Sequence, residues 1–99
     1  MPRTRDDILK ILEANREKIR SYGVQRIGLF GSCARGESSA QSDLDFVVDF
    51  QVKSFDAYMD LKEFLESLFG CRVDVVISDA IKPRLRRAIL QEAVHAPGL

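Results

Sequence analysis

The sequence predicts a small α/β fold in which a mixed sheet of about three strands is flanked by helices. Segments with the spacing of amphipathic helices alternate with short apolar segments rich in Val, Ile and Phe. The expected order is helix, strand, short helical turn, strand, helix, strand, helix. The helix between the second and third strands favours a parallel crossover. The chain has 99 residues, 45% of them hydrophobic, which predicts a single domain over residues 1–99.

The N-terminal part predicts one helix, one strand and a loop. Thr4 is a suitable N-cap, and apolar residues recur at helical spacing from about Arg5 to Tyr22. Gly23 can end this helix, and the apolar run from Val24 to Phe30 then predicts a strand. Residues 31–42 have no sustained period and predict a loop with one helical turn.

The middle of the chain predicts a buried strand followed by a long helix. Asp43 to Phe50 reads D-L-D-F-V-V-D-F, in which Phe and Val favour a buried strand. Ser54 is a suitable N-cap for a helix from Phe55 to Phe69, whose apolar residues share one face. Gly70 is placed to end that helix.

The C-terminal part predicts a third strand and a last helix. Cys71 to Ser78 reads C-R-V-D-V-V-I-S, which favours a strand, and Pro83 is placed to open the helix. An apolar stripe on this helix consists of Leu85, Ala88, Ile89 and Ala93. The tail from His95 to Leu99 is expected to be frayed.

The charged residues balance overall but are unevenly distributed. Fifteen Lys and Arg residues match fifteen Asp and Glu residues, which disfavours attraction of the whole molecule to DNA or to an anionic membrane. The net charge is +3 over residues 1–26, −6 over 27–79 and +3 over 80–99. No apolar signal stretch or membrane span is evident, and a cytoplasmic protein with reduced thiols is expected. Cys33, Cys71 and the single His95 form no zinc-binding pattern.

Three aspartates are candidates for a metal site. Asp43 and Asp45 are two positions apart on a predicted strand, so their side chains would project from the same face. Asp74 lies early in the third strand, and a parallel neighbour would place it at the same end of the sheet. Close carboxylates repel each other unless they share a proton or a cation, and their oxygen atoms favour Mg²⁺ or Mn²⁺. The alternative is an ordinary exposed strand end.

Gly31 and Ser32 are candidates for a phosphate-binding turn. They follow an apolar strand and precede a predicted helical turn, where backbone N–H groups and a hydroxyl can hold phosphate oxygens. For this pair taken alone, the alternative is an ordinary turn. The succession of this turn and the aspartates favours a combined site.

One stretch of the chain resembles a known catalytic signature. Gly31-Ser32, ten further residues and Asp43-Leu44-Asp45 are similar to the nucleotidyltransferase signature of the DNA polymerase beta superfamily. The runs G-L-F-G-S-C-A-R-G-E and S-D-L-D-F-V-V resemble the minimal nucleotidyltransferase (MNT) group across essentially the whole chain. Members of that group are antitoxins paired with HEPN-domain toxins. The resemblance implies the polymerase beta-like nucleotidyltransferase fold and a cytoplasmic location in a prokaryote.

The resemblance also implies roles for the candidate residues. Gly31 and Ser32 would hold the triphosphate of ATP, and Asp43 and Asp45 would bind metal ions, with two Mg²⁺ expected. Asp74 matches the third carboxylate of the family. That carboxylate completes the second metal site and helps to activate the attacking hydroxyl.

Further residues of the loop match or depart from the family pattern. Arg35 matches the arginine of the A-R-G segment and would contact a phosphate or a carboxylate, the alternative being a salt bridge to Glu37 or Asp43. Ser42 would orient the loop beside the first aspartate. Cys33 stands where many relatives carry Arg, so a second cation on this loop is not implied.

Other polar residues are expected to have ordinary structural roles. Asp49 is interpreted as a solvent-facing residue at the end of its strand, and His95 has no evident catalytic partner. A basic run is interpreted as a solvated helix face, with a surface for a partner or RNA as the alternative. This run consists of Lys82, Arg84, Arg86 and Arg87.

The resulting hypothesis is an antitoxin that transfers AMP from ATP to a hydroxyl of a cognate HEPN toxin, expected to be that of a tyrosine, in an Mg²⁺-dependent reaction. The short chain favours an acceptor held on a partner chain. The alternatives are an antitoxin that acts by binding alone and a nucleotidyltransferase for a small molecule such as an aminoglycoside. Neither membrane binding nor direct DNA binding is expected.

Overall fold

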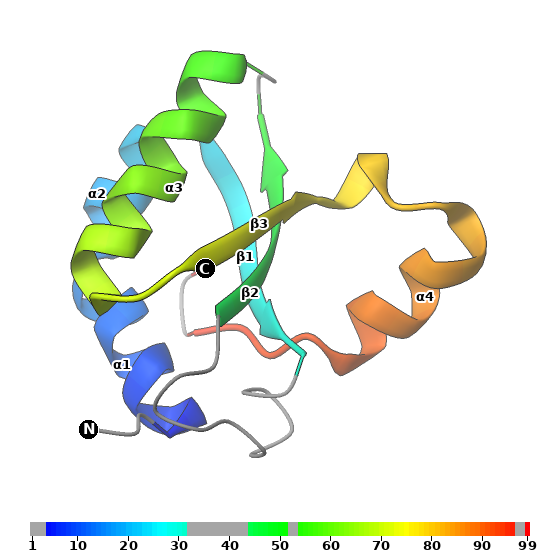
Figure 1. Ribbon diagram of the computed structural model, residues 1–99, viewed down its shortest axis with the longest axis horizontal. Coiled ribbons are helices and arrows are strands. Elements are labelled where there is room, and N and C mark those ends of the chain that lie inside the picture. Colours follow the sequence, from blue (N-terminus) through cyan, green and yellow to red (C-terminus); the bar gives the residue numbers. More distant parts are fainter. Residues whose placement is uncertain (1–3, 32–43, 52–53, 97–98) are drawn as a thin grey trace.

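The computed structural model describes residues 4–31, 44–51, 54–96 and 99. Its centre is a three-stranded sheet in the order β1-β2-β3, formed by β1 (Val24–Phe30), β2 (Leu44–Phe50) and β3 (Val73–Ile77) (Figure 1). β1 and β2 are antiparallel, whereas β2 and β3 are parallel. The predicted mixed sheet is therefore confirmed, while the helical turn predicted between β1 and β2 lies outside the described residues.

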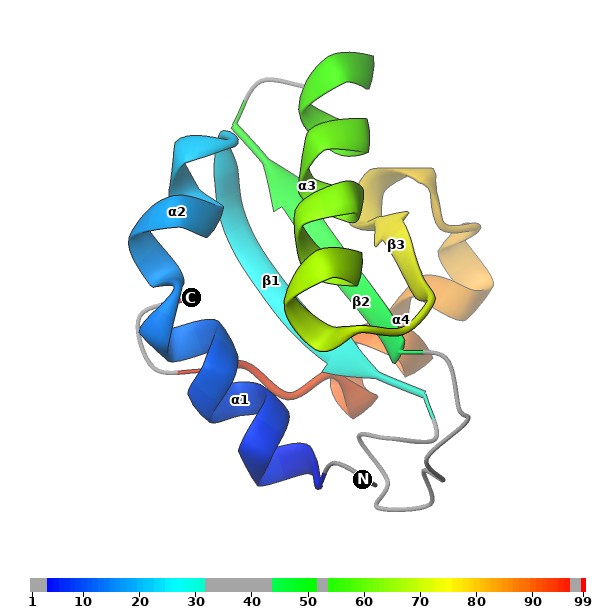
Figure 2. The same ribbon diagram turned by 60° about the vertical axis from the view of Figure 1, so that its left-hand side comes forward.

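Helices cover one face of this sheet. They are α1 (Arg5–Ala14), α2 (Arg16–Ser21) and α3 (Phe55–Phe69), and they lie on the same side in both ribbon views (Figures 1 and 2). Because α3 connects the parallel strands β2 and β3, the predicted crossover is also confirmed.

The N-terminal helix predicted from Arg5 to Tyr22 is wrong in one respect, because it is interrupted at Asn15. The Asn15 backbone has φ −109° and ψ 18°, and its side-chain amide donates to the Ile11 carbonyl at 2.8 Å. Such local bonds let asparagine compete with the helical pattern. Thr4 is the N-cap as predicted, since its hydroxyl accepts a backbone N–H of the first turn at 3.1 Å.

The sheet face beneath α1, α2 and α3 holds the hydrophobic core, and we call it the packed face. The sheet contributes Val24, Ile27, Leu29, Leu44, Phe46, Val48, Phe50, Val73 and Val75. The helices contribute Ile8, Leu12, Ile19, Leu61, Leu65 and Phe69. The rings of Phe46 and Phe69 stack with their centroids 5.8 Å apart, so aromatic packing ties α3 to the central strand.

The predictions for α3 are confirmed at both ends, and those for the third strand need adjustment. The Ser54 hydroxyl accepts the Ala57 backbone N–H at 3.3 Å, and Gly70 ends the helix in the left-handed region with φ 66°. The third strand begins at Val73 and ends at Ile77, so it is shorter at both ends than the predicted Cys71 to Ser78, and Ser78 instead opens a short 3₁₀ helix, η1 (Ser78–Ala80).

The last helix, α4 (Pro83–Glu92), lies on the other side of the sheet from α1, α2 and α3 (Figure 1), and we call that side the open face. α4 begins at Pro83 as predicted. Its apolar stripe is nevertheless not built into the core, because no residue of α4 is buried and Leu85 remains 49% exposed.

The prediction of a frayed tail from His95 to Leu99 is wrong for His95 and Ala96, which are held in place together with Val94 before them. Val94 forms an isolated antiparallel bridge with Leu29 of β1, with both backbone N–H···O distances at 2.8 Å. Ala96 is only 2% exposed. The edge of β1 offers unpaired backbone groups that an extended segment can bind, which is a long-range partner that local sequence does not reveal. No helix within the described ranges combines the length and apolar character needed to cross a membrane.

Candidate functional site

Two aspartates lie side by side on the open face. Along β2, Asp45 is half-buried between Leu44 and Phe46, both of which are buried in the packed face. Asp45 is the direct register partner of Asp74 on the parallel neighbour β3. Neighbouring strands lie about 4.8 Å apart, and paired residues project to the same face. The structure therefore brings together two of the three predicted carboxylates.

Gly31 lies against the carboxylate of Asp45. Phe30, the last residue of β1, is the register partner of Asp45, and Gly31 follows it with φ 82°. A Cβ atom at Gly31 would lie 3.2 Å from Asp45 Cγ and closer still to Asp45 Oδ2. This approach and the positive φ both require glycine, so the start of the predicted phosphate-binding turn adjoins the carboxylate pair.

Several predicted site residues lie outside the described residues: Ser32, Arg35, Ser42 and Asp43. Of the predicted site, the structure thus places Gly31, Asp45 and Asp74, at one end of the sheet. Within the described ranges, no three His, Cys, Asp or Glu side chains are grouped as a metal-binding cluster. The remaining predicted carboxylate, Asp43, is the residue immediately before β2 in the sequence.

The chemistry of this pair fits a divalent cation of the Mg²⁺ type. The donors are carboxylate oxygens, which such hard cations prefer, and two adjacent like charges gain from a shared cation. Asp74 is exposed to solvent and Asp45 is half-buried, so both can reach a bound ion. The glycine backbone beside Asp45 leaves space that any side chain would fill.

Asp49 also lies on the open face, but it differs from the predicted solvent-facing residue. It is half-buried, and its carboxylate accepts a hydrogen bond from the hydroxyl of buried Ser78. This bond links the end of β2 to η1. Asp49 is two register positions beyond Val47 and four residues from Asp45, so it stabilises the sheet end opposite to the carboxylate pair.

His95 has a defined position that sequence reasoning missed. Its Nδ1 lies 2.8 Å from the Ile27 carbonyl oxygen, and because a carbonyl only accepts, Nδ1 carries the proton. A Cβ at Gly28 would lie 2.8 Å from His95 Cε1 and 3.2 Å from the Cβ of Ala93. The signal available in the sequence was a glycine inside an apolar strand, which often marks a close approach.

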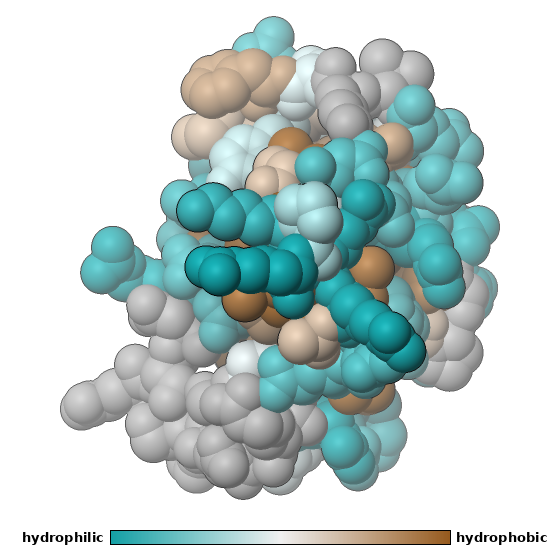
Figure 3. All heavy atoms as spheres, turned by 90° about the vertical axis from the view of Figure 1, so that its right-hand side faces the viewer, coloured by the Kyte–Doolittle hydropathy of each residue, from teal (hydrophilic) through white to brown (hydrophobic). Residues whose placement is uncertain are grey.

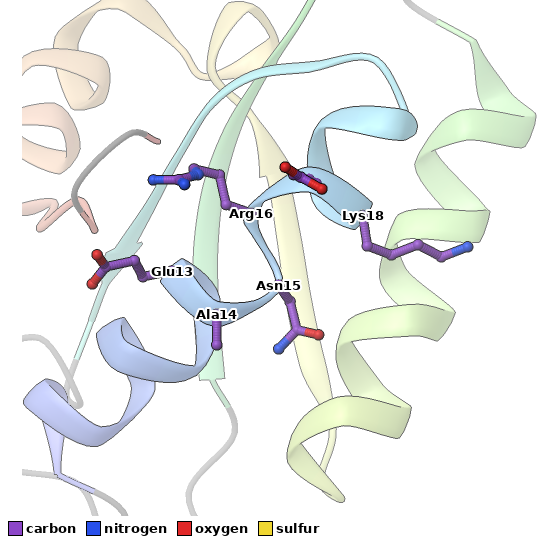
Figure 4. Close-up of a pocket in the computed structure, with 6 residues that line it drawn as sticks. Glu13, Ala14, Asn15, Arg16 and Lys18 are labelled. Atoms are coloured by element: carbon purple, nitrogen blue, oxygen red, sulfur yellow. The ribbon is translucent and has the colours of Figure 1, made fainter.

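Two hollows among the described residues lie away from this site. One of about 370 Å³ is formed where α1 ends and α2 begins, and its labelled side chains point in different directions rather than converging (Figure 4). Another, of about 380 Å³, is lined by Ser54, Phe55, Tyr58 and Ile77. Neither contains a residue of the predicted site, so the carboxylate pair is the stronger candidate.

Comparison with known proteins agrees with this arrangement. The nucleotidyltransferase domain family matches residues 8–95. Over 94 residues the chain is 39% identical to the protein adenylyltransferase MntA of Thermococcus cleftensis, covering 93% of this chain and 95% of that protein. The chain belongs to the nucleotidyltransferase domain family. It is accordingly a nucleotidyltransferase enzyme, as predicted.

Solved structures place this nucleotidyltransferase more narrowly. It is similar to a minimal nucleotidyltransferase structure with a TM-score of 0.73 and 42% identity, covering 87% of this chain and 93% of that chain. It is also similar to a toxin–antitoxin structure with AMP-PNP, with a TM-score of 0.64 and 25% identity, covering 91% of this chain and 69% of that chain. The predicted minimal nucleotidyltransferase fold is therefore confirmed.

Proposed function

We propose that this nucleotidyltransferase is an antitoxin that transfers AMP from ATP to a tyrosine hydroxyl of a HEPN-domain toxin in the cytoplasm. The observation that carries the proposal is the register pairing of Asp45 with Asp74 beside Gly31. A relative 39% identical is a protein adenylyltransferase, and a structural neighbour is a toxin–antitoxin complex with AMP-PNP. The relative supports transfer of an adenylyl group to a protein, and the structural neighbour supports an ATP-like nucleotide and a toxin partner.

In this proposal, the carboxylates would bind the metal ion and the segment that begins at Gly31 would bind the phosphates. Asp45 and Asp74 would hold Mg²⁺ together with Asp43, the residue that precedes β2 in the sequence. Bound Mg²⁺ supplies charge neutralisation at the triphosphate and at the departing pyrophosphate. Gly31 begins the segment that would hold the phosphates through its backbone, which the absence of a Cβ keeps accessible.

The loop residues Ser32, Arg35 and Ser42 remain part of the proposed nucleotide site. Ser32 would donate its hydroxyl to a phosphate oxygen, and Arg35 would add an always-charged guanidinium. Ser42 would orient the loop next to the metal-binding aspartates.

The transfer is a displacement at the α-phosphorus of ATP. The tyrosine hydroxyl oxygen forms a bond to that phosphorus while the bond to the bridging oxygen of pyrophosphate breaks. Asp74, which is exposed at the open face, helps to take up the hydroxyl proton. Most of the rate enhancement would come from fixing the reacting atoms in line and from neutralising charge.

The test is label transfer from α-labelled ATP to the HEPN-domain protein encoded by the adjacent reading frame, in the presence of Mg²⁺. We expect label on a tyrosine of that protein and its loss in the Asp45→Asn/Asp74→Asn variant. Asp60→Asn, an exposed carboxylate of α3, is the matched control.

The outcomes separate the alternatives. Absence of label on the partner overturns the transfer. If the Asp45→Asn/Asp74→Asn variant restores the growth of cells that express the toxin, the result would favour neutralisation of the toxin by binding alone. Label on an aminoglycoside, with drug resistance, would favour a small-molecule acceptor.

A further inference from the structure

α4 receives little support from the rest of the described chain. No residue of α4 is buried, whereas α3 buries Leu61, Leu65 and Phe69. Lys82 at the N-cap forms no side-chain cap, and the first turn has no acidic residue to complement the helix dipole. Isolated helices of about ten residues are marginal in water. A protein that packed against α4 and brought negative charge to its N-terminus would stabilise it.

The apolar residues of α4 are exposed to an unusual degree for this chain. Among the described residues, the large hydrophobic side chains that are exposed are Phe55, Leu85 and Leu90, and two of these three belong to α4. Leu85 is 49% and Leu90 41% exposed. Figure 3, which looks at this side of the molecule, shows apolar groups between extended hydrophilic side chains. Leu85 and Leu90 are five residues apart, about 140° around the helix axis, so they flank the exposed side of α4.

The charges around these leucines are positive. Lys82, Arg84 and Arg87 are exposed. Within residues 54–96, Arg86 is the member of the basic run that forms an ion pair, with Asp79 at an N···O distance of 2.9 Å. We call Lys82, Arg84, Leu85, Arg87 and Leu90 together the α4 surface. Arg84 and Arg87 lie between the two leucines on the exposed side of the helix, so the complement of this surface has acidic side chains between apolar ones.

The α4 surface adjoins the side of the sheet that carries the proposed chemistry. α4 lies on the open face (Figure 1), to which the Asp45 and Asp74 side chains also project. Val47, between Asp45 and Asp49 on this face, is 3% exposed yet is not part of the core on the packed face. A protein bound to α4 would therefore extend over the same side of the molecule as the carboxylate pair.

We propose that the α4 surface is the docking site for the acceptor protein, and that the acceptor presents acidic side chains between apolar ones to it. This inference rests on the proposed transfer of AMP to a partner protein. Docking on α4 holds the acceptor on the open face, where its hydroxyl can reach the nucleotide. It also gives the basic run a role in recognition.

The test measures binding without ATP, by calorimetry, with the HEPN-domain protein of the adjacent reading frame. Arg84→Glu/Arg87→Glu is expected to weaken binding at least about tenfold, with the larger loss at low salt. Lys10→Glu/Arg16→Glu makes the same change in net charge at exposed residues of α1 and α2, and it should stay within about twofold of the parent.

A second variant tests the apolar part of the surface. Leu85→Gln/Leu90→Gln leaves the charge unchanged and is also expected to weaken binding about tenfold, because the partner would then bury less apolar surface. Circular dichroism before titration shows whether each variant keeps its helices, and the exposure of both leucines favours normal folding.

Binding and transfer are measured separately, so their failures can be told apart. Asp45→Asn/Asp74→Asn should bind the partner normally and lose label transfer. If only the α4 variants weaken binding, the result supports the α4 surface, even when no label reaches the partner. The absence of label would overturn the proposed function only. Equal affinities of the two charge-reversal variants overturn the α4 surface. The α4 surface is also overturned as the acceptor's docking site if the α4 variants change only self-association of this chain or only RNA binding, because the surface then has another occupant.

Discussion

The two faces of the sheet are made by the same strands, yet the packed face is apolar whereas the open face mixes carboxylates with apolar residues. On β2, Phe46 and Val48 point to the packed face and are fully buried, while Asp45 and Val47 point to the open face. The open face places Asp45 next to Asp74, and like charges on paired positions destabilise a sheet. The difference teaches that the packed face stabilises the fold, and this allows the open face to hold groups that are unfavourable for folding.

The largest expected effect comes from removing a carboxylate on the open face. Asp45→Asn should reduce AMP transfer about 10³-fold, because it weakens charge neutralisation in the transition state. The free energy of unfolding should change by less than about 1 kcal/mol, since Asp45 lies outside the hydrophobic core. Transfer of label and thermal unfolding measure the two quantities. Retained transfer together with a loss of more than about 1 kcal/mol in stability would show that Asp45 is structural.

Adjacent valines of β2 offer a direct comparison of the two faces. Val48→Ala should lower the free energy of unfolding by about 2–3 kcal/mol, because its cavity lies in the close-packed core. Val47→Ala should cost about 1 kcal/mol, because Val47 lies outside the core on the packed face. Chemical denaturation of both variants measures the difference. Equal losses would mean that the open face is packed as tightly as the other.

The sequence predicted the elements whose signals are local. Ser54 and Gly70 bound α3 as expected, and Pro83 opens α4. The break at Asn15 was missed because apolar spacing continues through it, and the side-chain bond to Ile11 decides the backbone there.

The candidate site was predictable in outline but not in detail. The topology implied that Asp45 and Asp74 share one end of the sheet, and their pairing confirms it. The β-bridge of Val94 with Leu29 and the packing of His95 against Gly28 join residues more than 60 positions apart, so no local pattern could reveal them. α4 looks like a core helix in sequence, and only the structure shows that its apolar residues are left exposed.

A glycine substitution tests the contact between loop and carboxylate. Gly31→Ala should cost about 1–2 kcal/mol in stability because of its positive φ, and it should reduce transfer about 10- to 100-fold because the new Cβ displaces Asp45. Gly70→Ala is the matched control, since Gly70 also has a positive φ but nothing within 4 Å of a Cβ. It should lose similar stability and keep the transfer rate. Equal transfer rates in both variants would show that Asp45 tolerates the displacement.

The smallest expected effect lies on the packed side, at the start of α3. Ser54→Ala removes the hydroxyl that accepts the Ala57 N–H at 3.3 Å, and it should lower the free energy of unfolding by about 1 kcal/mol. Ser67→Ala makes the same chemical change at an exposed interior position of α3 and should be neutral or slightly stabilising, because alanine is the better helix former. AMP transfer at saturating substrate should be unchanged in both, since α3 packs against the face that carries no carboxylates. A transfer defect in Ser54→Ala without a stability loss would mean that the two faces are coupled through β2 and β3 rather than separate in function.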